Sequence, residues 1–299
     1  MKLVSKLRTK HFKFLKTIVK MLRRYRYVPV YVMASKLGIK SYFVRKEAQY
    51  LKEHGLIEIR TKDYEGYGIT TLGLDVLALN ALSEIVDVEK IGHRYDVGKE
   101  ADIYLCYSKL GDPYIIKAYR IGRTSFKKIR VARPEYSVST GGWIRLNIKA
   151  AHREYDILEK LWMGGVSVPK PLMRAYHMIL MEYVPGEELH KIILENPLEI
   201  FESIIKEVLK AYYNAGIVHA DLSEYNVLVN KKSGEIWIID WPQWIDVEHG
   251  EAEEYLEKDI EQILRFFNKK YRLDVDFLWN KFENILSRYK KLDGAKEAT

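Results

Sequence analysis

The sequence is poor in cysteine and has no long apolar segment. Cys106 is the single cysteine among 299 residues, so no disulfide can form within the chain. One cysteine fits a reducing compartment such as the cytoplasm. No apolar run approaches the roughly 18–20 residues of a membrane-spanning helix, and the basic N-terminus lacks the apolar stretch of a secretory signal. We therefore expect a cytoplasmic protein that makes no membrane contact.

Acidic residues are scarce in the first part of the chain. Residues 1–85 contain seventeen Lys and Arg but seven Asp and Glu, a net charge of +10, whereas residues 86–299 carry −2. The overall composition, 47% hydrophobic and 30% charged, is that of a globular protein, and the length suits two domains. The asymmetry indicates a polyanion partner for the first part, and a solvated basic face without a partner is the alternative.

Apolar spacing in residues 1–85 predicts a winged-helix domain. Helices are expected over 8–24, 30–37, 42–53 and 71–83, and hairpin strands over 56–60 and 67–70. Ser41 is the expected N-cap of the third helix, which in this fold normally enters a major groove. Its exposed side offers groups that contact phosphates or base edges, namely Ser41, Tyr42, Arg45, Lys46 and Gln49. Winged helices also dock proteins, so DNA, structured RNA and protein all remain open as ligands.

The remainder of the chain predicts a two-lobed α+β domain. Strands are expected over 86–94, 101–107, 114–119, 169–175 and 177–183, with hairpin strands over 227–230 and 235–239. Helices are expected over 147–163, 197–215 and 252–290. Residues 125–147 fit no period and are predicted to be an insertion without regular structure. The lobes are assigned to about 86–180 and 187–299, with a hinge at 181–186.

The segment 219–226 carries the strongest chemical signal. His219, Asp221 and Asn226 form an H-x-D-x-x-x-x-N loop, and Asp240 ends the strand that follows. Phosphoryl transfer needs one carboxylate near the attacking oxygen and oxygen ligands that hold Mg²⁺ against the phosphates. We assign Asp221 to the first role, Asn226 and Asp240 to the metal (Mg²⁺, or alternatively Mn²⁺), and Glu224 to the nucleotide site. If the loop were only a turn, Asp221 and Asn226 would be turn formers.

A lysine within an apolar strand complements this loop. Lys117 lies in the run Ile-Ile-Lys-Ala, where an unpaired charge would be costly. Phosphate oxygens and the carboxylate of Glu154, on the helix 147–163, are its expected partners. The predicted catalytic residues are therefore Asp221, Asp240 and Lys117. Alternatively, Lys117 could extend to solvent from an edge strand.

Two further segments suit ATP. A turn between two strands can present backbone N–H groups to phosphates, and it consists of Gly98, Lys99, Glu100, Ala101 and Asp102. The backbone of Glu182 and Val184 could meet an adenine edge, with Met181 behind it. Only 59 residues follow Asp240, too few for the activation loop and peptide-binding helices of an ordinary protein kinase.

These motifs resemble the RIO family of atypical serine/threonine protein kinases, and within it the second subfamily, with an archaeal source expected. The resemblance is carried by residues 98–104, 122–126, 219–226 and 239–243, and by the winged helix. It implies binding to a pre-small-subunit ribosomal particle, ATP hydrolysis and serine autophosphorylation. It also implies a phospho-aspartate at Asp240 and contact of the winged helix with ribosomal RNA or protein.

Three positions depart from the subfamily pattern. Ala101 stands where a Ser is usual, Asp96 where a Gly is frequent, and Ala220 where a Gly follows the catalytic His. The four central residues are present, so we expect an active phosphotransferase. Two alternatives remain: a DNA-binding regulator whose C-terminal half senses nucleotide, and a small-molecule kinase of the aminoglycoside-kinase type.

Overall fold

The computed structural model describes residues 1–97, 100–121 and 142–297, which form two compact units. The first comprises Met1–His152 with Leu172–Met181, and the second comprises Arg153–Pro171 with Glu182–Thr299. Both mix helices with sheets, as the predicted α+β class requires. The domain boundary at residue 85 and the limits of the two lobes remain predictions.

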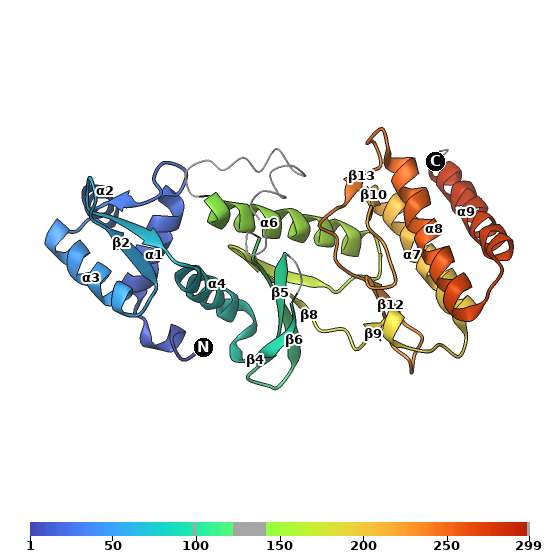
Figure 1. Ribbon diagram of the computed structural model, residues 1–299, viewed down its shortest axis with the longest axis horizontal. Coiled ribbons are helices and arrows are strands. Elements are labelled where there is room, and N and C mark those ends of the chain that lie inside the picture. The colour runs from blue at the N-terminus through green and yellow to red at the C-terminus, as the bar shows by residue number, and fades with distance from the viewer. Residues whose placement is uncertain (98–99, 122–141, 298–299) are drawn as a thin grey trace. The chain divides into compact units, whose positions relative to one another are not determined.

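The winged helix has the predicted elements (Figure 1). Its helices and strands, after a short 3₁₀ turn η1 (Val4–Lys6), are α1 (Thr9–Met21), β1 (Val28–Pro29), α2 (Val30–Leu37), α3 (Ser41–Glu53), β2 (Ile57–Arg60), β3 (Gly66–Ile69) and α4 (Thr71–Val86). The sheet order is β1-β3-β2. Ser41 as N-cap of α3 was wrong: the cap is Lys40, whose backbone is extended, and Ser41 lies inside the first turn without a capping bond.

The winged-helix core is apolar and fully buried. Phe14, Leu15 and Ile18 of α1 pack with Val44 of α3 and Tyr67 of β3. The helical spacing of these α1 positions is why periodicity located the helix correctly. The start of α6 joins this cluster, so the winged helix and the helix after it share one core within the first unit.

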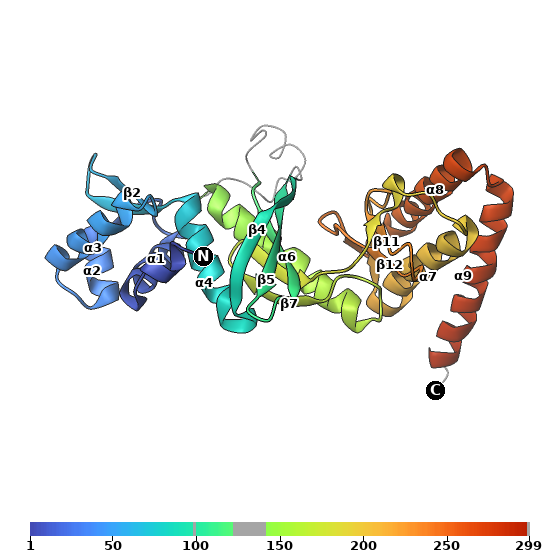
Figure 2. The ribbon, with the colours of Figure 1, turned by 90° about the horizontal axis from the view of Figure 1, so that it is seen from below.

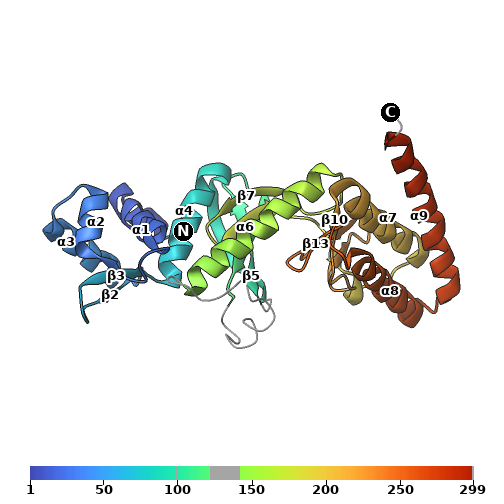
Figure 3. The same cartoon turned by 90° about the horizontal axis from the view of Figure 1, so that it is seen from above.

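A five-stranded sheet completes the first unit. Its order is β4 (Val88–Val97), β5 (Ala101–Ser108), β6 (Pro113–Tyr119), β8 (Met178–Glu182) and β7 (Pro171–Ala175). Ala78 and Leu82 of α4 pack into its core. The helix α6 (Gly142–Met163) begins beside this sheet (Figure 3).

The prediction of no regular structure over 125–147 was wrong for its last six residues. They form the first turns of α6, because Ile144, Ile148 and Ala151 recur at helical spacing and pack inward. Asn147 is fully buried, and its Oδ1 accepts a hydrogen bond from Ile121 N at 2.7 Å. Residues 122–141, with the predicted start of a flexible loop at 122–126, lie outside the described residues.

The second unit contains the end of α6, three further helices and small sheets (Figure 2). The helices are α7 (Pro197–Ala215), α8 (Ala252–Tyr271) and α9 (Val275–Glu297), and a 3₁₀ turn η3 covers Leu189–Lys191. The sheets are β12-β11-β9 (Ile236–Ile238, Val227–Val229, Glu187–Glu188) and β10-β13 (Ile217–Val218, Ile245–Asp246). The helical region predicted over 252–290 is interrupted at Arg272, which adopts a left-handed conformation.

The structure bears on two features that are scarce in the sequence, namely long apolar segments and cysteine. Among the described residues, no helix is both long and apolar enough to cross a membrane. Cys106 is buried in β5, and burial raises the pKa of its thiol to about 12. The thiolate is therefore scarce at neutral pH, which makes this cysteine a packing residue.

Candidate phosphotransfer site

The loop 219–226 is a tightly hydrogen-bonded turn between β10 and β11. Asn226 Nδ2 donates to Asp221 O at 2.8 Å, and Asn226 N donates to Ser223 O at 2.9 Å. Ile239 N donates to Asn226 O at 2.9 Å, which draws the residue before Asp240 against the same turn. The structure thus brings Asp221, Asn226 and the backbone leading to Asp240 together within the second unit.

A buried aspartate of α8 holds the backbone of the loop 219–226 in place. Asp259 of α8 is 4% exposed, and its two carboxylate oxygens accept hydrogen bonds from Ala220 N and Leu222 N, each at 2.8 Å. Burial raises the pKa of Asp259, while nearby His219 and the two N–H donors oppose that rise. Sequence reasoning missed this residue. The feature of the sequence that could have indicated Asp259 is its position in a helix, next to Ile260 and one turn before Ile263, which are both buried.

His219 is a structural member of the loop. Its Nε2 lies 3.1 Å from Ile239 O, and its ring packs on Trp241 with centroids 4.5 Å apart. Trp241 is buried and donates from Nε1 to Ile238 O at 3.1 Å. These contacts connect the segment before Asp221 to the segment around Asp240, so the histidine positions the two loops relative to each other.

Two residues of these loops have left-handed backbone conformations. Ala220 and Asp240 both have φ of 64°. Such a conformation is uncommon for a residue other than glycine, and it costs alanine about 1–2 kcal/mol. Aspartate tolerates it better than alanine, and residues of this kind cluster at functional sites. The backbone at Asp240 therefore turns sharply where the predicted metal ligand leaves the strand.

We expect Ala220→Gly to stabilise the protein by up to about 1 kcal/mol. Glycine removes the left-handed penalty, and the greater freedom of the unfolded glycine chain offsets part of the gain. Guanidinium unfolding of the two proteins measures the difference. The control is Ala211→Gly, inside the last third of α7, which should destabilise by about 1 kcal/mol or more because it adds a helix-propensity cost and removes a buried methyl group. A less stable Ala220→Gly protein would contradict the backbone argument.

Lys117 occupies the centre of β6. It is 8% exposed, faces Ile103 of β5 across the ladder, and lies between the buried Ile116 and Ala118. Its Nζ is 5.7 Å from the centroid of the Tyr119 ring. Burial in mid-strand excludes the alternative of a lysine extended from an edge strand. Glu154, on the part of α6 that belongs to the second unit, is also buried, and its pairing with Lys117 remains a prediction.

The predicted phosphate loop is described from Glu100 onward, since Gly98 and Lys99 lie outside the described residues. Glu100 O accepts a hydrogen bond from Arg120 N at 2.7 Å. Asp102 is fully buried, and its Oδ2 lies 3.4 Å from Arg120 Nε. The carboxylate of Asp102 is therefore engaged with Arg120. Residues 100–102 can offer a phosphate only their backbone N–H groups.

A polar cluster under that loop links α4 to the sheet. Arg120 donates to both carboxylate oxygens of Asp75, at 2.7 and 2.9 Å, and His177 Nε2 lies 2.8 Å from Asp75 Oδ1. Burial alone would raise the pKa of Asp75, but His177 and Arg120 outweigh it, so this pKa lies below its usual value. Burial lowers the pKa of His177, against the pull of Asp75, and the ring is neutral at pH 7. Sequence reasoning missed this cluster, whose members lie far apart along the chain.

The predicted adenine-binding segment has one backbone donor left over. Glu182 N donates to Lys170 O at 3.0 Å, so this amide is already used. Val184 O accepts from Gly186 N at 2.9 Å, whereas Val184 N donates to no described residue. Met181 is buried at the end of β8. Of the two predicted contacts, Val184 N–H is thus the amide that could meet an adenine edge.

The predicted metal ligands fit Mg²⁺ of a nucleotide-bound kind. Among the described residues there is no group of three or more His, Cys, Asp or Glu that could hold a metal alone. Magnesium usually takes one or two protein oxygens and completes its shell with water and substrate phosphates. Asn226 Nδ2 is engaged, and its Oδ1 accepts no hydrogen bond from a described residue. Asn226 therefore keeps an amide oxygen that can bind a metal, and the assignment of Asn226 and Asp240 as a ligand pair remains a prediction.

Glu224 lies on the same loop and is half-buried. Its Oε2 is shielded from solvent and has no hydrogen-bond partner among the described residues, while its backbone O accepts from His190 N at 3.3 Å. The His190 ring packs on Tyr225 with centroids 4.4 Å apart. A buried oxygen without a partner suits a ligand that brings its own donor, such as a ribose hydroxyl or bound water.

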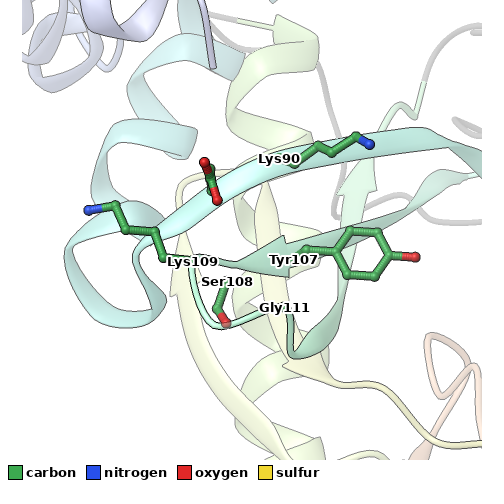
Figure 4. A pocket seen from close by; sticks show the side chains of 6 residues that line it. Lys90, Tyr107, Ser108, Lys109 and Gly111 are labelled. Atoms are coloured by element: carbon green, nitrogen blue, oxygen red, sulfur yellow. The ribbon is translucent and has the colours of Figure 1, made fainter.

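A separate hollow lies at the far end of the β4–β5 hairpin (Figure 4). It is lined by Glu89, Lys90, Tyr107, Ser108, Lys109 and Gly111. Lys109 pairs with Asp87 at 2.6 Å, an exposed ion pair that contributes little. None of the predicted site residues lines this hollow, so we do not assign it to the phosphotransfer site.

The five predicted nucleic-acid contacts of α3 differ in availability. Arg45 Nε is bonded to Glu65 of the wing at 2.8 Å, and Gln49 is bonded to Glu53 at 2.9 Å. Ser41 is half-buried. Tyr42 and Lys46 are exposed, and neither makes a hydrogen bond or ion pair with a described residue. Intrahelical and wing contacts thus occupy two of the predicted five.

Sequence comparison identifies two domains. Residues 102–278 match the RIO domain, and residues 4–85 match the family described as Rio2, N-terminal. Serine/threonine-protein kinase rio2 of Schizosaccharomyces pombe is 30% identical over 257 residues, which cover 85% of this chain and 74% of that protein. RIO-type serine/threonine-protein kinase Rio2 of Methanocaldococcus jannaschii is 34% identical and covers 85% and 94%. The chain spans 65% of the Saccharomyces cerevisiae relative RIO2, which is 30% identical.

Structure comparison agrees with the sequence. The crystal structure of the Rio2 kinase-ADP/Mg²⁺-phosphoaspartate complex from Chaetomium thermophilum matches with a TM-score of 0.77 and 25% identity. The match covers 99% of this chain and 98% of that one. The match therefore spans both the segment that carries the motifs and the N-terminal winged helix. The chain belongs to the RIO family of serine/threonine-protein kinases, in the branch that carries the Rio2 N-terminal domain.

Proposed function

We propose that the protein is a Mg²⁺- and ATP-dependent serine/threonine kinase or ATPase that acts in maturation of the small ribosomal subunit in the cytoplasm. The observation that carries the chemistry is the hydrogen-bonded turn of Asp221 and Asn226, with Asp240 joined to it through Ile239. The relative crystallised with ADP and Mg²⁺ supports the same nucleotide and metal.

Each predicted residue has a role in this proposal. Asn226 and Asp240 would hold Mg²⁺, which when bound would neutralise charge on the phosphates. Lys117, braced by Glu154, aligns the phosphates. Asp221 is exposed, and its carboxylate accepts no hydrogen bond from a described residue, so it is available to take the proton of an attacking hydroxyl or water.

Asp240 is also the proposed phosphate acceptor. One of its carboxylate oxygens attacks the γ-phosphorus, a bond forms to that oxygen, and the bond to the β-phosphate oxygen breaks to release ADP. Water then attacks the acyl phosphate, phosphate leaves, and the free carboxylate is restored. The related Rio2 kinase from Chaetomium thermophilum forms a phosphoaspartate complex with ADP and Mg²⁺, which supports this assignment.

A ribosomal particle is the proposed partner. The winged-helix segment carries a net charge of +10, which suits an RNA-rich assembly. The rest of the chain is close to neutral at −2, so electrostatic attraction to a polyanion is concentrated in the N-terminal part.

The experiment is to incubate the protein with γ-labelled ATP and Mg²⁺ and to characterise the labelled bond. Label that hydroxylamine removes, and that disappears in Asp240→Asn, would support the phospho-aspartate. Acid-stable label would indicate a phosphoserine and make protein phosphorylation the main reaction. Neither label nor released phosphate above background would contradict the proposed activity.

A further inference from the structure

We propose that the end of α2, the turn after it and the start of α3 bind unpaired bases of RNA, by stacking on aromatic rings and by contacts from lysines to the phosphates. This inference rests on the proposed function, in which the winged helix meets ribosomal RNA or protein. The residues involved, called here the α3 surface, are Lys36, Ile39, Lys40, Tyr42, Phe43 and Lys46.

Exposed aromatic rings are the first feature of the α3 surface. Tyr42 is 69% exposed and Phe43 is 50% exposed, whereas Phe14 and Tyr67 of the same domain are buried in its core. The Tyr42 and Phe43 rings contact each other edge to face, with centroids 5.5 Å apart and planes at 73°. The pair therefore presents flat apolar area to solvent as two adjoining aromatic rings.

Unpaired positive charge is the second feature. Lys36, Lys40 and Lys46 are exposed, and none forms an ion pair with a described residue. Lys46 lies one helical turn after Tyr42 and Phe43, on the same side of α3. The lysines and the aromatic rings thus alternate along residues 36–46. No described acidic side chain pairs with these lysines, so their positive charge is not compensated.

The acidic residues nearby are already matched elsewhere. Glu47 pairs with Lys10 at 2.6 Å and lies 3.2 Å from His11 Nε2. Glu65 pairs with Arg45 at 2.8 Å, and Glu53 accepts from Gln49. These contacts hold the carboxylates away from the three lysines, which leaves the lysines for a polyanion.

The chemistry of the α3 surface favours unpaired bases over a duplex. Reading base edges in a major groove depends on bidentate side chains such as Arg and Gln, and here Arg45 Nε is bonded to Glu65 and Gln49 Nε2 to Glu53, so base reading would first have to break these exposed contacts. Bases in a duplex are stacked on each other and cannot stack on Tyr42 or Phe43. Unpaired bases can, and aromatic platforms flanked by cations are how single strands are bound. Protein interfaces, by contrast, are depleted in lysine.

The test uses the full chain and a fluorescein-labelled, unstructured 12-nucleotide RNA, compared with the duplex of the same sequence, by fluorescence anisotropy. We expect the single strand to bind more tightly than the duplex. Tyr42→Ala/Phe43→Ala should weaken single-strand binding about tenfold or more, because each stacked base contributes strongly. The ring-retaining variant Tyr42→Phe/Phe43→Tyr should stay within about twofold of the wild type, since both platforms remain.

A second arm tests the lysines by salt dependence. Lys40→Ala/Lys46→Ala should reduce the slope of log affinity against log salt by about 1.4, because each phosphate contact to a single strand contributes about 0.7. The charge-matched control is Lys16→Ala/Lys20→Ala on the exposed side of α1, which should leave the slope unchanged. All four side chains are exposed, and circular dichroism of each variant verifies that it folds.

Three results would overturn the inference: equal affinity for strand and duplex, an unchanged affinity in Tyr42→Ala/Phe43→Ala, or an equal loss in the ring-retaining variant. A DNA strand of the same sequence bound as tightly as the RNA would overturn the choice of RNA. ATP turnover of the wild-type chain is measured in parallel. Absent turnover would contradict the proposed function, whereas normal turnover with failed RNA discrimination would contradict only the α3 surface.

Discussion

Replacing Asp240 with asparagine is expected to lower the rate of phosphoryl transfer from ATP by about 10²-fold or more. Phosphoryl transfer is catalysed mostly by positioning and by fixed charge, and loss of one such group costs a few orders of magnitude. Asparagine keeps the size of the side chain and tolerates the left-handed backbone at φ 64°, so the substitution removes the negative charge without disturbing the turn. The same change removes the proposed phosphate acceptor.

Single-turnover release of labelled phosphate measures this effect. The matched control is Glu257→Gln, which removes one exposed carboxylate from α8 and should leave the rate unchanged. Asp221→Asn should also lower the rate strongly, through loss of the proton acceptor. If Asp221→Asn and Asp240→Asn both turned over ATP at nearly the wild-type rate, the proposed mechanism would be wrong.

Arg120→Met should destabilise the first unit by about 3–5 kcal/mol, the usual cost of removing one partner from a buried ion pair. Arg120 holds Asp75 at 2.7 and 2.9 Å and the fully buried Asp102 at 3.4 Å. Methionine has a similar length but leaves both carboxylates without this cation. Because Arg120 N also holds Glu100 O, we expect the strand after the phosphate loop to loosen first.

Guanidinium unfolding and amide hydrogen exchange in β5 and β6 measure this loss. Arg120→Lys keeps the charge but not the two-pronged geometry, so it should lose less than Arg120→Met. Asp75→Asn/Arg120→Met should lose less than the sum of the two single variants, because the first change removes one of the stranded charges. Additive losses would show that the residues act independently and would refute the cluster.

The same cluster predicts the direction of a pH dependence. The lowered pKa of Asp75 gives stability that is complete above the unfolded value of about 3.9 and lost as pH falls through the folded value. The lowered pKa of His177 means that the unfolded chain binds an extra proton below about pH 6.5, so stability also falls there. In Arg120→Met the cation that opposes His177 protonation is gone, and protonated His177 can pair with Asp75. The deficit of this variant should therefore be smaller at pH 5.5 than at pH 7.5, and a larger deficit at pH 5.5 would refute this account.

Local features of the sequence were sufficient for the winged helix and for the phosphotransfer loops. Helical spacing in α1 to α3 marks a buried face, and a turn-rich segment between two strands marks the wing. Asp221 and Asn226 lie five residues apart, so one hydrogen bond within the turn brings them together. The start of α6 escaped prediction because its few apolar residues follow a long polar segment, and their burial depends on a core shared with the winged helix.

By itself, the sequence determined the family-specific motifs and the residues that we propose for the chemistry, since motif and spacing are properties of neighbouring residues on the chain. Only the tertiary structure decided which polar side chains are already committed. Asp259 supports the catalytic loop from α8, Arg120 joins Asp75 to Asp102, and Arg45 is bonded to Glu65 of the wing. The contacts of Asp259 and Arg120 form because packing buries charges that are distant in sequence, and a buried charge is stable only beside its partner, whereas Arg45 and Glu65 meet on the surface. The same packing leaves Tyr42, Phe43 and their neighbouring lysines in solvent, where a ligand can reach them.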